Sequence, residues 1–233
     1  MAGRVGFRFT SRRDGDLGID APGELARRRR GVVDLPWSVA RQVHGIDIAV
    51  VAEPGGCFGA TCDGFVTAVP GAAIAVQTAD CGPVLIEGRD AAGDPVVGAV
   101  HAGWRGLYDG VLESALDALV RLGARDVTAV VGPCISASRY EFGAAELARL
   151  ALRFGPDVVA ATAWGTPAFD LSAAIHSEAR RLGIALACPD APPCTAATVD
   201  DAGDPAYFSW RARADTGRQS SVIWIERDGS SGV

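Results

Sequence analysis

The fold of this chain is decided by the stretch AIAVQTADCGPVLIEGRDAAGDPVVGAVHAGWRG, which spans residues 73–106. Its apolar and β-branched runs, bounded by Gly and Pro, predict three strands, over residues 73–78, 83–87 and 96–101. Two polar groups, TADC and HAGWRG, stand where the first and third of these strands end. Polar groups are costly to bury unless they have partners. The centre of the sequence therefore predicts a sheet with candidate functional residues at its strand ends.

A helical period follows this stretch. Over residues 106–121, Leu107, Val111 and Leu119 fall on one face of a helix. The same criteria predict four more strands and two more helices: strands over 47–52, 64–67, 127–131 and 222–226, and helices over 144–152 and 171–182. Asp170 and Gly183 bracket the last helix as its cap and its stop. This mixture predicts an α/β or α+β domain, in which helices pack over sheet faces.

Length and charge narrow the class of protein. The 233 residues are 48% hydrophobic, enough for one substantial core, and we predict a single domain over residues 1–233. The net charge of −6 argues against a surface for nucleic acid or anionic lipid, so we expect a small ligand. All 22 basic residues are Arg. The absence of Lys excludes a Schiff-base lysine and a P-loop lysine. A phosphate must then be held by Arg, hydroxyls, backbone N–H groups or a metal.

The sequence predicts a cytoplasmic protein. Its first residues, MAGRVGFRFTSRRDGD, do not combine an apolar stretch with a small-residue cleavage site, so we expect no signal peptide. No run of about 18 apolar residues predicts a membrane span. The six Cys are too few for a disulfide scaffold at this length, and we expect free thiols or ligands.

Two of the three His and one Cys form the leading functional candidates. His44 lies in QVHG and His101 in HAGWRG, and each is near a Gly, which lets the backbone approach a ligand closely. Cys81 ends the TADC group before a Gly-Pro break. Two His and one Cys suit a catalytic zinc with an open fourth position. The same residues also make a Cys–His nucleophile pair. The residue types alone leave both roles open, and they leave open a buried free thiol.

Four neighbouring residues complete the candidate set. Arg105 is the natural anion holder, because a guanidinium grips phosphate at two points. Trp104 is a candidate for stacking on a planar base, with core packing as its structural alternative. Gln42, in the QVHG group, is assigned to the substrate site. Asp80 is predicted either to orient a His ligand or to cap a turn.

Three other features are given less weight. Cys134, in GPCIS, follows a predicted strand and is a weaker candidate than Cys81. His176 opens an H-x-E match to the zinc deaminase signature, but Ala197 stands where the second half, P-C-x-x-C, needs Cys. We therefore predict that His176 belongs to an ordinary amphipathic helix. The basic run at residues 27–30 is predicted to be a solvated helix end or loop.

Taken in order, several blocks of this sequence resemble the YfiH/laccase-domain family: QVHG (42–45), DGFVT (63–67), TADCGPVLI (78–86), AVHAGWRG (99–106), GPCIS (132–136), YEFG (140–143), CT (194–195), YFSWR (207–211) and TGRQSSVIW (216–224). The resemblance implies an α/β/β/α sandwich, a fold shared with toxin-type cysteine hydrolases. It implies a zinc bound by His44, Cys81 and His101. It also implies phosphorolysis of adenosine, inosine and methylthioadenosine, with adenosine deamination, by a monomer or homodimer.

The resemblance leaves two other activities open. One is a cysteine amidase that edits peptidoglycan precursors, with Cys81 as nucleophile and His101 as base. The other is a copper-dependent polyphenol oxidase, since copper is the alternative metal. Ser138 and Arg139 stand where the family carries further Cys, and the chain has only three His, which weakens the copper alternative. A non-enzymatic module with a structural metal is disfavoured, because such sites normally have four protein ligands.

Overall fold

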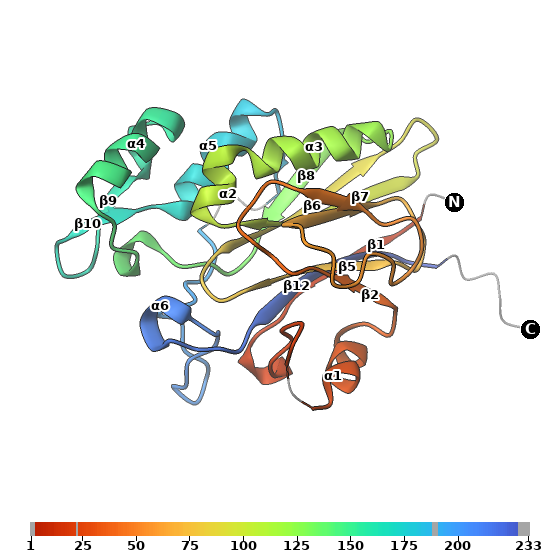
Figure 1. Ribbon diagram of the computed structural model, residues 1–233, viewed down its shortest axis with the longest axis horizontal. Helices are drawn as coiled ribbons and strands as arrows, with labels where there is room; N and C mark the ends of the chain where they lie inside the picture. Colours follow the sequence, from red (N-terminus) through yellow and green to blue (C-terminus); the bar gives the residue numbers. More distant parts are fainter. Residues whose placement is uncertain (1–2, 22, 188–190, 228–233) are drawn as a thin grey trace, which may run out of the picture.

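The computed structural model describes residues 3–21, 23–187 and 191–227. Two β-sheets are stacked, and helices cover the outer face of each (Figure 1). The larger sheet has six strands, in the spatial order β11 (Ala185–Leu186), β8 (Arg125–Val131), β6 (Gly82–Arg89), β7 (Pro95–Ala102), β4 (Gly64–Thr67) and β3 (Ile48–Val50). The smaller sheet has four, in the order β1 (Val5–Phe9), β12 (Gln219–Ile225), β5 (Ala73–Thr78) and β2 (Trp37–Val39).

The helices form the outer layers. The six-stranded sheet is covered mainly by α2 (Trp104–Asp109), α3 (Val111–Arg121) and α5 (Leu171–Arg181). Beside them lie α4 (Ala144–Phe154) and a hairpin of β9 (Val159–Ala161) and β10 (Pro167–Phe169). On the other side, α1 (Leu25–Val32) packs near the four-stranded sheet, and α6 (Trp210–Arg213) lies at one end of it. Short 3-10 turns span Arg12–Asp14, Ala137–Arg139 and Pro156–Val158.

Three apolar cores separate these four layers, and β5 shows how the sequence specifies them. Successive side chains of a strand point to opposite faces of its sheet. Ile74 and Val76 therefore pack between the two sheets, whereas Ala73 and Ala75 lie on the outer face, in a core that includes Val32 of α1. Because both faces of β5, β6 and β7 are covered, these strands are continuous apolar runs without polar alternation. This layering is the predicted α/β/β/α sandwich.

All seven predicted strands are present, and Gly64–Thr67 and Ala73–Thr78 match their predicted bounds. The helix predicted over 106–121 is in fact two helices, because Gly110 has φ +105°, a left-handed conformation that ends α2 and starts α3. Its predicted apolar face is confirmed by burial of Leu107, Val111 and Leu119. Five strands were not predicted: β1, β2, β9, β10 and β11.

The third predicted helix is confirmed as α5, and the Asp170 carboxylate caps it by accepting a hydrogen bond from the Ala173 N–H (2.9 Å). Glu178 of this helix is 1% exposed and pairs with Arg153 (2.9 Å) and Arg181 (2.7 Å). Burial opposes ionisation of Glu178, but hydrogen bonds from the two guanidinium groups lower its pKa below the usual value. The ion pair between Glu178 and Arg153 joins α5 to α4.

The basic run at residues 27–30 forms the middle half of α1. Its prediction as a solvated helix end or loop is wrong for Arg29, which is buried, with its guanidinium 5.6 Å from the Trp37 ring and 5.5 Å from the Phe58 ring. The aromatic rings provide a cation–π environment that a charge-run rule does not foresee. Among the described residues, no helix is long and apolar enough to cross a membrane.

Candidate active site

The three leading candidates lie together where the chain passes from the small sheet to the large one. Cys81 lies in the short link between β5 of the small sheet and β6 of the large one. His101 is near the end of β7, whose register places it opposite Pro83 of β6. His44 arrives on the loop between β2 and β3. One nitrogen or sulfur atom from each side chain lies within 4.8 Å of the others, and Cys81 Sγ is 3.8 Å from His44 Nε2. The structure therefore brings together the three residues that the sequence analysis singled out.

A buried carboxylate that the sequence analysis missed holds two of these residues. Asp63 is 0% exposed and accepts backbone N–H bonds from Val43 (3.2 Å), His44 (2.9 Å) and Gly45 (2.7 Å). Its Oδ1 also lies 2.8 Å from Nδ1 of His101. The sequence signal was an acidic residue at the start of an apolar strand, a group that must find partners when it is buried.

The loop of His44 is bent to suit this carboxylate. His44 has φ +61°, a left-handed conformation that is uncommon for a non-Gly residue and that lets consecutive N–H groups converge on one anion. Burial opposes ionisation of Asp63, but hydrogen bonds from His101 and the backbone lower its pKa below the usual value. Asp63 therefore acts as a carboxylate that orients the His101 ring and leaves its Nε2 free for a ligand.

Electrostatics couple Cys81 to the two imidazoles. Burial opposes ionisation of the Cys81 thiol, but His101 and His44 favour the thiolate and lower its pKa to about 6. Burial likewise opposes protonation of His101, and the Cys81 thiolate and Asp63 carboxylate raise its pKa to about 9. Near neutral pH these charges favour a thiolate beside an imidazolium. A thiolate is the form of Cys that binds metal or attacks an electrophile.

Gly103 lets the three side chains approach one another. A Cβ atom at this position would lie 2.7 Å from His44 Cδ2 and 3.3 Å from Cys81 Sγ. It would also be 3.6 Å from His101 Cε1. Carbon atoms in contact normally stay about 3.5–4.0 Å apart. The Gly of HAGWRG therefore provides the space that the constellation occupies.

The three side chains open into a cavity of about 480 Å³. It is lined by Gln42, His44, Gln77, Thr78, Ala79, Asp80, Cys81, His101, Trp104, Arg105, Tyr140, Trp210, Arg211 and Arg218. All seven residues predicted for the site thus lie around one cavity. Tyr140, Trp210, Arg211 and Arg218 were not assigned roles from the sequence, although YEFG and YFSWR had been noted as motifs.

Arg105 and Trp104 begin α2 together. Arg105 is exposed, and its guanidinium carbon lies 4.5 Å from the centre of the Trp104 ring. Trp104 in turn packs edge-on against Phe142, with ring centres 5.7 Å apart. Gln42 lines the cavity but has a structural task, because its amide donates to the Gln77 carbonyl (2.8 Å) and accepts from the Gln77 N–H (2.8 Å). Of the three substrate-site candidates, only Gln42 forms side-chain hydrogen bonds within the described residues.

Asp80 does not touch the His ligands. Its Oδ1 accepts hydrogen bonds from the hydroxyl groups of Thr195 (2.7 Å) and Ser209 (2.6 Å), and its Oδ2 accepts from the Arg211 N–H (2.6 Å). Its φ of +109° is strained for a non-Gly residue. Of the two predicted alternatives, the geometry favours the structural one, while Asp63 takes the role of orienting a His. Asp80 joins three distant segments of chain directly beside Cys81.

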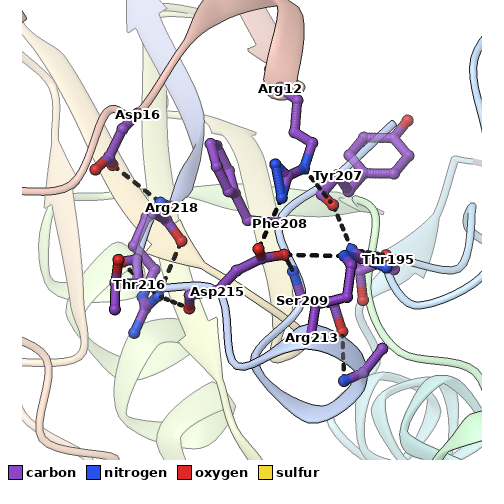
Figure 2. Close-up of polar contacts among 12 residues, drawn as sticks. Arg12, Asp16, Thr195, Tyr207, Phe208, Ser209, Arg213, Asp215, Thr216 and Arg218 are labelled. Carbon is purple, nitrogen blue, oxygen red and sulfur yellow. Dashed lines mark hydrogen bonds and ion pairs between the residues drawn. The ribbon is translucent and has the colours of Figure 1, made fainter. Parts of the chain in front are cut away.

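Figure 2 shows how the wall beside Asp80 is held together. Asp215 accepts hydrogen bonds from the Ser209 N–H (2.9 Å), from Arg12 (2.7 Å) and from Arg213 (3.0 Å). Burial opposes ionisation of Asp215, but these donors lower its pKa below the usual value. Arg218 donates to three consecutive backbone carbonyls of the same loop, at 2.9 to 3.1 Å. This network fixes α6 and the segment that follows it.

The two less favoured candidates lie outside the cavity. Cys134 is 2% exposed, and burial raises the pKa of its thiol above the usual value, so it is an unreactive group. His176 lies on α5, as predicted for an ordinary amphipathic helix, and does not line the cavity. The described part of the chain therefore brings together two of the three His and not the third.

Comparison with known proteins places this site in a family. Residues 13–226 match the family described as multi-copper polyphenol oxidoreductase laccase. The chain is 38% identical over 217 residues to a purine nucleoside phosphorylase of Mycobacterium tuberculosis, covering 90% of this chain and 82% of the relative. It is also 38% identical over 214 residues to a purine nucleoside phosphorylase of Streptomyces coelicolor, covering 89% of this chain and 83% of the relative.

Solved structures share the fold. A Neisseria meningitidis protein is 28% identical, with a TM-score of 0.72 and coverage of 96% of this chain and 95% of that one. YlmD from Geobacillus stearothermophilus is 24% identical, with a TM-score of 0.74 and coverage of 97% and 89%. The second likeness concerns the fold alone. On the match over residues 13–226 and the identity to these relatives, the chain belongs to the YfiH/laccase-domain family.

Proposed function

We propose that this chain is a cytoplasmic, metal-dependent purine nucleoside phosphorylase. It would cleave adenosine, inosine or S-methyl-5′-thioadenosine with inorganic phosphate, releasing the free base and the 1-phosphate of the sugar. The observation that supports this most is the cavity, which holds a His–Cys–His ligand set and the cationic side chains of Arg105 and Arg211 together. Relatives that are 38% identical carry the name purine nucleoside phosphorylase.

The donor atoms fit a zinc ion. Imidazole nitrogen and thiolate sulfur are the ligands that zinc prefers, and three protein ligands leave a position open, as in catalytic sites. His44, Cys81 and His101 would hold the metal, and Asp63 would fix the ring of His101. A bound zinc would act as a Lewis acid and lower the pKa of water, which is the chemistry that the associated adenosine deamination needs.

The donor set is less suited to a multicopper oxidase. Copper sites of that class need additional imidazole or soft ligands. The chain has three His in all, and His176 lies on α5, outside the cavity. Copper stays the alternative metal for the single His–Cys–His set, because divalent copper binds most nitrogen and sulfur sites more tightly than zinc.

The cavity residues supply positioning and electrostatic stabilisation for phosphorolysis. A phosphate oxygen forms a bond to C1′ of the sugar while the bond from C1′ to the purine nitrogen breaks, and the departing base takes that electron pair and a proton. Arg105, which lines the cavity, would hold the phosphate dianion against C1′. Its charge also offsets the repulsion between phosphate and the thiolate of Cys81. Trp104 and Trp210 provide aromatic surface for the flat base.

The test uses protein purified without added metal. Bound metal is quantified, and adenosine and inosine are followed by chromatography with and without phosphate. His101→Ala should lose both the metal and the product. His176→Ala is the matched control, since His176 does not line the cavity, and it should keep both. Fully metallated wild-type protein that releases no base and no inosine would refute the proposal.

A second candidate function is favoured by one observation. Cys81, His101 and Asp63 stand in the relation of nucleophile, base and orienting carboxylate, with the carboxylate 2.8 Å from the imidazole. This arrangement would suit a cysteine amidase that acts on cell-wall precursors. Such an enzyme would work after the metal has been removed by a chelator, and an electrophilic substrate analogue would label Cys81. Full amidase activity in a Cys81→Ser variant would exclude it.

A further inference from the structure

Tyr140 is an enclosed side chain that no step described so far uses. Its ring packs edge-on against Phe142, with centres 4.8 Å apart, and lies 6.2 Å from the Phe169 ring. Only 7% of the residue is exposed, and it lines the active-site cavity. Within the described residues, no group is hydrogen-bonded to its hydroxyl, which is also not among the fully enclosed polar atoms. The rigidly held ring therefore presents an unpartnered donor to the cavity.

Arg211 covers the face of this ring. Its guanidinium carbon is 4.9 Å from the centre of the Tyr140 ring. The residue is fixed at two points, because its backbone N–H donates to Asp80 (2.6 Å) and its Nη1 donates to the Glu141 carbonyl (3.0 Å). In the part of the chain that the structure describes, no carboxylate forms an ion pair with Arg211 or with Arg105. Neither guanidinium is therefore engaged by a described carboxylate, and both residues line the cavity.

The carboxylate that lines the cavity already accepts hydrogen bonds from other groups. Asp80 is the one carboxylate among the lining residues, and both of its oxygens are occupied in this way. Burial is the main reason that the pKa of Tyr140 is raised above its usual value, and the thiolate of Cys81 raises it further. The hydroxyl is therefore a neutral donor throughout the physiological pH range. An unpartnered donor on a ring that is covered by a cation, in a cavity that Arg105 also lines, favours an anion.

We propose that the Tyr140 hydroxyl and the Arg211 guanidinium, together with Arg105, form an anion-binding subsite for the inorganic phosphate of the reaction. The identity of the anion rests on the proposed function, whereas the existence of the subsite rests on the geometry. The Tyr140 hydroxyl donates a hydrogen bond to a phosphate oxygen, and its proton stays on Tyr140. Arg211 supplies charge, and its stacking on the ring keeps the donor in place.

The chain contains a matched control for this arrangement. Arg149 lies over the Tyr108 ring, with its guanidinium carbon 4.9 Å from the ring centre, the same distance as for Arg211 and Tyr140. Tyr108 and Arg149 do not line the cavity. Removing a hydroxyl or a charge from each pair separates a role in anion binding from a role in packing.

The first experiment measures thermal unfolding with increasing inorganic phosphate, using chloride at equal ionic strength as reference. Phosphate should raise the Tm of the wild type and of Tyr108→Phe, because a ligand that binds the folded state stabilises it. In Tyr140→Phe, the phosphate concentration needed to raise the Tm by the same amount should be about ten- to hundred-fold higher. This is the loss of affinity expected when one hydrogen bond to a charged acceptor is removed. Arg211→Gln should behave like Tyr140→Phe, and Arg149→Gln like the wild type.

The second experiment divides the kinetic effect between the two substrates. In Tyr140→Phe, KM for phosphate should rise about ten- to hundred-fold, while KM for inosine and the metal content stay near their wild-type values. A rise in KM for inosine alone, or an unchanged phosphate response in the thermal experiment, would overturn the subsite. If the wild type shows no phosphorolysis but phosphate still stabilises it through Tyr140, the proposed function fails and the anion subsite stands.

Discussion

The substitution Gly103→Ala adds one methyl group beside His44, Cys81 and His101, and it tests whether these three residues bind a metal. The added Cβ would lie 2.7 Å from His44 Cδ2, roughly 1 Å closer than carbon atoms normally pack. Gly103 has φ −71° and ψ 156°, a conformation open to Ala, so the strain falls on the neighbouring side chains and not on the backbone. Relieving the clash moves the His44 ring by roughly 1 Å, whereas metal–ligand distances hold within about 0.2 Å.

Gly103→Ala should therefore keep the fold and lower zinc affinity by about ten- to hundred-fold, with a stability cost of about 1–3 kcal/mol from overpacking. Zinc titration calorimetry and circular dichroism measure the two effects. Gly98→Ala, in strand β7, which ends directly before Gly103, is the control, because its Cβ would meet nothing closer than 3.5 Å and should leave zinc binding intact. If Gly103→Ala folds and binds zinc as the wild type does, His44, Cys81 and His101 are not the ligand set.

Three further perturbations follow from the charges in the structure. In metal-free protein, alkylation of Cys81 by iodoacetamide should rise with pH around a midpoint near 6, and a midpoint near 9 would contradict the coupling to His101. The pKa of Glu178 is lowered in the folded protein. Its contribution to the free energy of unfolding is therefore complete above the unfolded-state pKa of 4.5 and is lost as the pH falls through the folded-state pKa. Denaturant unfolding should therefore show Glu178→Gln about 1–3 kcal/mol less stable than the wild type at pH 7, and the gap should close in acid. Asp63→Asn should weaken zinc binding about ten- to hundred-fold, and Asp80→Asn should lower Tm with little change in zinc affinity; equal zinc losses would refute this division.

The parts of the fold that could be predicted from the sequence are those with a strong local signal. Strands β5, β6 and β7 are buried on both faces, so they appear as apolar runs whose ends are marked by Gly, Pro or polar groups. Strand β2 has three residues, and β11 has two, too few for a periodic pattern. These short strands exist because a longer neighbour provides hydrogen bonds, which is information from distant residues.

The break between α2 and α3 illustrates a different limit. The apolar face of the predicted helix continues across the break, because Leu107 and Val111 both reach the same core. The 3.6-residue period therefore cannot distinguish one long helix from two successive helices whose apolar faces point to the same core. The positive φ of Gly110 makes the break, and a single Gly within a helical pattern is only a weak signal of it.

The candidate site also contains residues that the sequence marks and residues that only the fold reveals. His44, Cys81 and His101 could be found because His is scarce in this chain and each residue lies in a Gly-containing turn group. Asp63 and Tyr140 lie in the DGFVT and YEFG blocks, but their partners His101 and Arg211 are close to them only in the folded protein, so no local pattern assigns their roles. Asp80 was found by its position next to Cys81, but its partners Thr195, Ser209 and Arg211 come from the end of the chain.

Two buried aspartates, placed beside strands of different sheets, divide the organisation of the cavity between them. Asp63 binds the loop of His44 and the ring of His101, so one carboxylate sets the relative position of two metal-ligand candidates. Asp80 binds the start of α6 and the segment around Thr195, so it places Arg211 over Tyr140. Because Cys81 directly follows Asp80 in the chain, the backbone joins the thiolate to the carboxylate that holds Arg211. Strain at Asp80 is thus located where the candidate metal ligands and the proposed anion subsite are joined through the chain.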